Sequence, residues 1–151
     1  MSETRWATFD CYGTLIDWNL GIRTELERVF GVAEAPRLLE RYHELEPELE
    51  SDPFRSYREV TTLALEQLAE DESIQLPEGE AGSLAHSLPD WPPFSEVPAA
   101  LAELRDRGWK LAILSNTDRD LIESSQRQLG VAIVLAIVAE DVESYKPAHA
   151  H

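Results

Sequence analysis

The sequence has little cysteine, few basic residues and no long apolar run. Its single cysteine, Cys11, excludes an internal disulfide and favours a reducing, cytoplasmic compartment. Thirteen Lys and Arg residues against 29 Asp and Glu give a formal net charge of −16, which argues against nonspecific binding of DNA or RNA. Because no apolar run approaches the roughly 20 residues of a membrane span, and the N-terminus does not read as a signal peptide, we expect no membrane partner.

The 151 residues suffice for about one domain, and they contain no internal repeat. Apolar stretches predict strands over about 6–10, 110–114 and 133–138, with helices over 97–107 and about 118–129 between them. Strands that alternate with helices over short connections imply a parallel sheet with right-handed crossovers. The region from Asp17 to about Leu88 instead shows helical spacing throughout, with an acidic loop over 71–82.

A carboxylate stands at the carboxyl end of the first predicted strand. It belongs to Asp10, and the turn Gly13-Thr14 follows shortly after it. In an open α/β sheet, ligands bind at the carboxyl ends of the strands. The turn can direct backbone N–H groups toward an anion, so Asp10 is interpreted as a nucleophile in an anion-binding loop. The alternative is an aspartate that only caps the turn.

Two later motifs favour the catalytic interpretation. Ser115-Asn116 ends the second strand, and Lys146-Pro147 follows the third. Asp, then Ser-Asn, then Lys-Pro, in this order and context, resembles the haloacid dehalogenase (HAD-like) hydrolase superfamily. The resemblance implies an α/β fold, with a Rossmannoid parallel-sheet core over 1–16 and 92–151 and an inserted α-helical cap over 17–91. That family continues beyond the lysine motif with another strand and a fourth motif, so we expect a truncated chain whose core is incomplete at the C-terminus.

Tyr12 indicates which branch of the superfamily the chain resembles. Phosphatases of the superfamily usually carry a second aspartate there, which protonates the leaving alcohol. With tyrosine in place of that aspartate, the loop resembles that of the type II (L-)2-haloacid dehalogenases. The chemistry is consistent with this, because a halide leaves without a proton. The same resemblance places a pocket arginine in the first insert, where Arg41 falls, and allows a homodimer formed through the cap.

The resemblance implies a role for each site residue. Asp10 would attack carbon 2 of a small haloacid anion and form an ester, with Lys146 stabilising its charge and Thr14 orienting the loop. The remaining expected residues would bind the substrate: Cys11, Tyr12, Arg41, Ser115 and Asn116. Each also has a structural explanation, because Ser115 and Asn116 could cap the next helix and Arg41 could be an exposed helix residue. Asp17 and Asp118 are expected to cap the helices that follow them.

Two other functions stay open. One is a phosphatase that needs Mg²⁺ and acts on a small phosphomonoester, whereas the dehalogenase would need no metal or other cofactor. The other is an inactive fragment or interaction module, because a core without its later strands exposes a sheet edge.

Overall fold

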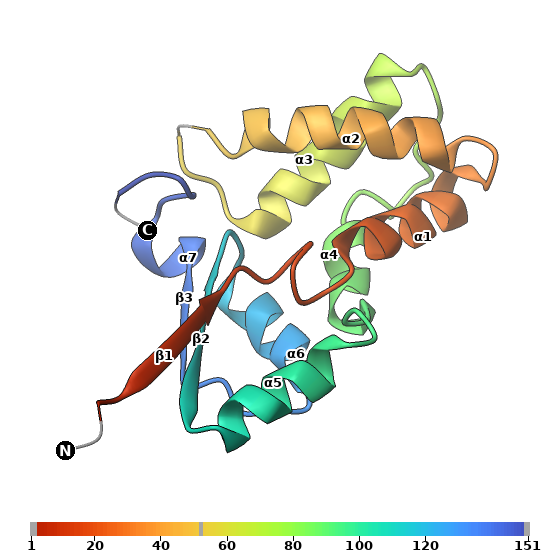
Figure 1. Cartoon of the computed structure of the whole chain (residues 1–151). Coiled ribbons are helices and arrows are strands. Elements are labelled where there is room, and N and C mark those ends of the chain that lie inside the picture. Colours follow the sequence, from red (N-terminus) through yellow and green to blue (C-terminus); the bar gives the residue numbers. More distant parts are fainter. Residues whose placement is uncertain (1–2, 52, 150–151) are drawn as a thin grey trace.

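The computed structural model describes residues 3–51 and 53–149, and its centre is a three-stranded parallel sheet. The strands are β1 (Arg5–Phe9), β2 (Trp109–Ser115) and β3 (Leu135–Val138), in the order β1-β2-β3. Arg5 pairs with Trp109, and Ser115 pairs with Val138. The predicted parallel sheet is therefore confirmed. Since the strands run the same way, their carboxyl ends meet at one edge of the sheet (Figure 1).

The crossovers of the sheet are helical. Helix α5 (Val97–Asp106) precedes β2, α6 (Arg119–Leu129) joins β2 to β3, and the short α7 (Ala139–Val142) follows β3. Gly130 ends α6 in the left-handed conformation, at φ 71°, which glycine adopts without the strain of a side chain.

The residues between β1 and α5 form a separate group of helices beyond the carboxyl end of the sheet (Figure 1). They are α1 (Trp18–Phe30), α2 (Ala35–Leu49), α3 (Tyr57–Asp71), α4 (Ser83–Ser87) and the 3₁₀ helix η1 (Leu88–Asp90). Asp17 caps α1 as expected, because its carboxylate accepts the N–H of Leu20 at 3.0 Å. The division of the chain at residues 16 and 92 stays a prediction.

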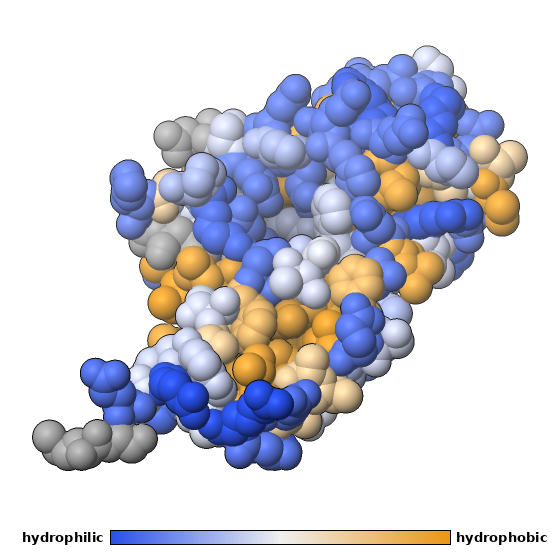
Figure 2. All heavy atoms as spheres, in the orientation of Figure 1, coloured by the Kyte–Doolittle hydropathy of each residue, from blue (hydrophilic) through white to orange (hydrophobic). Residues whose placement is uncertain are grey.

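One continuous core joins the sheet to the helices. Tyr42, Leu38 and Leu26 of the helical group are fully buried, as are Ile113 and Leu129 around the sheet. Hydrophobic residues gather over the sheet and α5 on the face seen in Figure 2, whereas the surface of α2 is mostly hydrophilic. In the part of the chain that the structure describes, no helix has the length and apolar character needed to cross a membrane.

Candidate active site

Asp10 lies directly after β1, where the chain turns sharply. The carbonyl of Cys11 accepts the N–H groups of Thr14, Leu15 and Ile16 at 3.2, 2.7 and 3.0 Å, which folds the loop back on itself. Gly13 has φ 85°, a conformation that a side chain would strain. The hydroxyl of Thr14 donates to Oδ2 of Asp10 at 3.1 Å. The turn therefore presents the Asp10 carboxylate and fixes its orientation.

Lys146 reaches the same carboxylate from the other end of the chain. Its Nζ lies 2.8 Å from Oδ1 of Asp10 and donates to the carbonyl of Leu114 at 2.7 Å. Asn116 holds the lysine segment, since its Oδ1 accepts the N–H of Lys146 at 2.7 Å. The three sequence motifs thus converge, as parallel strand ends are expected to do.

A cavity of about 220 Å³ lies over these groups. Trp18 and Tyr12 form part of its wall. Its lining residues come from the loop after β1, the start of α1, the C-terminal end of α2, the start of α3, the end of β2 and the segment after α7: Asp10, Tyr12, Trp18, Glu46, Glu50, Tyr57, Ser115, Asn116 and Lys146.

Comparisons with known proteins show which family the chain belongs to. A family model for haloacid dehalogenase-like hydrolases matches residues 4–150. The chain belongs to this family. It is 29% identical to haloacetate dehalogenase H-2 of Moraxella sp. (strain B), over 97% of this chain and 68% of the relative. It is 30% identical to the (S)-2-haloacid dehalogenase of Pseudomonas sp. (strain YL), over 97% and 66%. The chain therefore spans about two thirds of the length of these haloacid dehalogenases.

The fold of the family is seen in solved structures as well. The L-2-haloacid dehalogenase of Xanthobacter autotrophicus, solved with chloropropionic acid covalently bound, superposes with a TM-score of 0.80 at 20% identity. The match covers 96% of this chain and 60% of that protein. This likeness confirms the predicted HAD-like α/β fold with its helical insertion.

Two residues expected in the pocket of this haloacid dehalogenase-like hydrolase lie elsewhere. Arg41 pairs with Glu44 and with Asp71 of α3, both at 2.7 Å, so its placement in the pocket was wrong. The side chain of Cys11 is fully buried in the core, where burial raises the pKa of the thiol, so it does not line the cavity.

Asp118 is at the expected cap position but caps a different helix. Its carboxylate accepts the backbone N–H groups of Tyr57 and Arg58 at 2.6 and 2.9 Å. These groups belong to the first turn of α3, and Asp118 makes no side-chain cap bond to α6. The expectation that it caps α6 is therefore wrong. Asp118 instead joins the end of β2 to the helical group.

Three further residues that line the cavity were not predicted from the sequence: Glu46, Glu50 and Tyr57. Glu46 is 8% exposed, and its Oε1 accepts the hydroxyls of Tyr42 at 3.0 Å and Tyr57 at 2.6 Å. Helical spacing was the available signal, because Glu46 lies four residues after buried Tyr42, on the face that α2 turns inward. Arg41 falls outside that face.

The surroundings of Glu46 and Glu50 raise the pKa of both side chains. Burial raises the pKa of Glu46 to about 7, against the opposing effect of the two tyrosine hydroxyls. Burial and the charge of Glu46 together raise the pKa of Glu50 to about 8, although Asn116 and Lys146 favour its charged form. The α2 wall of the cavity therefore holds carboxyl groups that titrate near neutral pH.

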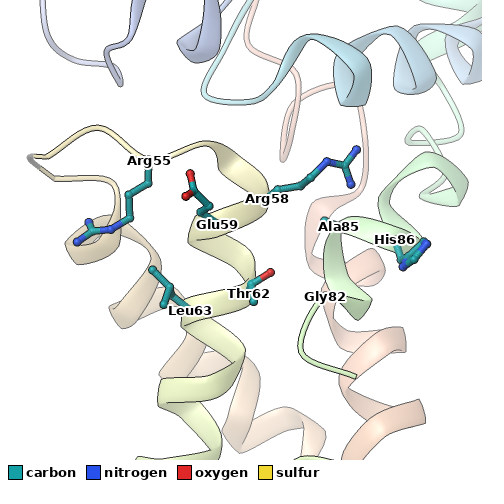
Figure 3. Close-up of a pocket in the computed structure, with 8 residues that line it drawn as sticks. All are labelled: Arg55, Arg58, Glu59, Thr62, Leu63, Gly82, Ala85 and His86. Atoms are coloured by element: carbon teal, nitrogen blue, oxygen red, sulfur yellow. The ribbon is translucent and has the colours of Figure 1, made fainter. Parts of the chain in front are cut away.

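A larger cavity, of about 440 Å³, lies between α3 and α4 (Figure 3). Arg55, Arg58, Leu63 and His86 are among its lining residues, and Asp10 and Lys146 are not. Arg58 is paired with Asp120 there. Among residues 3–51 and 53–149, no group of three or more His, Cys, Asp or Glu residues is arranged to hold a metal ion.

Proposed function

We propose that this protein hydrolyses the carbon–halogen bond of short 2-haloalkanoic acids, with Asp10 as the nucleophile. The contact that carries the proposal is the 2.8 Å ion pair between Asp10 and Lys146, two residues that line the cavity. The named activities of the relatives, haloacetate and (S)-2-haloacid dehalogenases, support the substrate class.

The reaction follows from the position of the carboxylate. One Asp10 oxygen attacks carbon 2 of the substrate, the carbon–halogen bond breaks, and the halide leaves with its electron pair. Water then attacks the carbonyl of the resulting ester, and the 2-hydroxy acid departs with the oxygen that belonged to Asp10. Lys146 and Thr14 keep the carboxylate aimed, while Ser115 and Asn116 contact the substrate and the departing halide.

Tyr12 favours this reaction over phosphate transfer. Its hydroxyl lies 2.9 Å from that of Ser125, and burial raises the pKa of Tyr12 well above its ordinary value. The tyrosine therefore keeps its proton at neutral pH and is a poor general acid for an alkoxide leaving group. Halide departure needs no such acid, so we propose a reaction without a metal or other cofactor.

The same proposal extends to partners and compartment. A small organic anion is the expected substrate, in a cytoplasmic enzyme without nucleic acid or membrane partners. The buried single cysteine fits a reducing compartment. A homodimer through the helical insertion stays a prediction.

Chloride release from 2-chloropropionate in the presence of EDTA tests the proposal. We expect release by the wild type, a loss of at least about 10³-fold in Asp10→Asn, and wild-type release by Asp106→Asn, a surface control. Phosphate release from a phosphomonoester that requires Mg²⁺, with no chloride release, would overturn the proposal. A folded protein with neither activity would point to an inactive module.

A further inference from the structure

With all its carboxyl groups ionised, the cavity would carry an excess of negative charge. Three carboxyl groups line it, on Asp10, Glu46 and Glu50, against the one ammonium group of Lys146. That ammonium already contacts Asp10 and the carbonyl of Leu114. The described lining residues include no arginine. A substrate carboxylate would therefore meet repulsion unless one of the carboxyl groups carries a proton.

The two glutamates occupy different depths at the end of α2. Glu46 is buried, and its carboxylate accepts hydrogen bonds from the hydroxyls of Tyr42 and Tyr57. Glu50 is half-buried, and its Oε2 lies 3.4 Å from Nδ2 of Asn116, the residue that follows β2. The titratable groups around the pair include Tyr42 of α2, Tyr57 of α3, Asp10 and Tyr12 after β1, and Tyr145 and Lys146 after α7. Arg55 also lies nearby, because its guanidinium donates to the carbonyl of Leu49 at 3.0 Å. Among the described residues that line the cavity, only Lys146 brings positive charge.

We propose that Glu50 binds the substrate carboxylate as a carboxylic acid, donating its O–H to one carboxylate oxygen. This assignment rests on the proposed dehalogenase function and extends it to a substrate-binding residue. At a pH where free Glu50 is ionised, each substrate that binds takes one proton from solvent, and that proton stays on Glu50 in the complex. The raised pKa of Glu50, about 8, supports the assignment, since the acid form then prevails at neutral pH.

The pH dependence of KM distinguishes this role from a structural one. For 2-chloropropionate we expect KM to rise about tenfold per pH unit above about pH 8, with kcat little changed, because binding requires one proton. In Glu50→Gln the amide donates at every pH, so KM should stay flat between about pH 7 and 9. Glu48→Gln, at an exposed position near the end of α2, should keep the wild-type profile. A flat wild-type KM, or an unchanged slope in Glu50→Gln, would overturn the proposal.

Propionate, an unreactive analogue, tests the binding step without turnover. Calorimetry near pH 9, in two buffers with different ionisation enthalpies, should show uptake approaching one proton per propionate in the wild type and none in Glu50→Gln. Absence of uptake, or tighter binding of propionamide than of propionate near pH 7, would overturn the assignment. Proton-linked propionate binding without any halide release would overturn the proposed reaction alone.

Discussion

Lys146 contacts both the proposed nucleophile and the end of β2. It pairs with Asp10 and with the carbonyl at the end of β2, so Lys146→Met should lower kcat/KM for halide release by about 10²–10³-fold. The melting temperature should change little, because partly exposed ion pairs contribute only about 1 kcal/mol or less. Steady-state kinetics and thermal melting test this, with exposed Lys110→Met as the control. Activity of Lys146→Met within about threefold of wild type would contradict the role.

The buried glutamates should also make the free energy of unfolding depend on pH. Their folded-state pKa values, about 7 for Glu46 and about 8 for Glu50, lie above the value near 4.5 of an unfolded glutamate. Between about pH 4.5 and 8 the folded state therefore holds protons that the unfolded chain has lost, and the free energy of unfolding falls as pH rises. Denaturant titrations near pH 5, 6.5 and 8 should show this fall, and a Glu46→Gln/Glu50→Gln variant should reduce it. An equal fall in that variant would contradict the account.

At the level of elements, Asp118 connects the sheet to α3. It is 3% exposed and accepts two N–H groups of the first turn of α3. Asp118→Ala leaves those donors without their acceptor and should cost about 1–3 kcal/mol of unfolding free energy. Asp120→Ala removes an exposed ion pair with Arg58 and should cost about 0.5 kcal/mol or less. Chemical denaturation compares the two, and equal losses would show that Asp118 is not a structural link.

Helix α1 packs closely on the segment that returns to the sheet. A Cβ added at Gly21 would lie 2.3 Å from the ring of Trp91, which is itself 4% exposed. Gly21→Ala should therefore destabilise the fold by about 1–3 kcal/mol through overpacking. Gly82→Ala has open space around the new methyl group and serves as the control. A melting temperature for Gly21→Ala at or above that of Gly82→Ala would contradict this packing.

For the molecule as a whole, the parallel sheet and the meeting of the three motifs could be predicted from the sequence. Apolar runs predicted the strands, and parallel strands bring Asp10, Asn116 and Lys146 to one edge. The orientation of α2 could not be predicted in the same way. It depends on the packing of Tyr42 against its neighbours, and it turns Glu46 inward where Arg41 was expected.

The hydrogen-bond partner of Asp118 is a second feature that could not be predicted from the sequence. Its local pattern correctly gave the N-cap position of α6, yet the acceptor is used by α3, some 60 residues earlier in the chain. Local propensity describes what a side chain can bond, and tertiary packing decides which partner it meets.

Transfer of an oxygen atom from Asp10 tests the central claim most directly. The protein would turn over 2-chloropropionate in oxygen-18 water, and mass spectrometry would follow both the product and the peptide that contains Asp10. We expect the first turnover to release lactate with ordinary oxygen while oxygen-18 enters the Asp10 carboxylate. Oxygen-18 in the product of a single turnover, with an unlabelled Asp10 peptide, would mean that water attacks the substrate directly and would contradict the account.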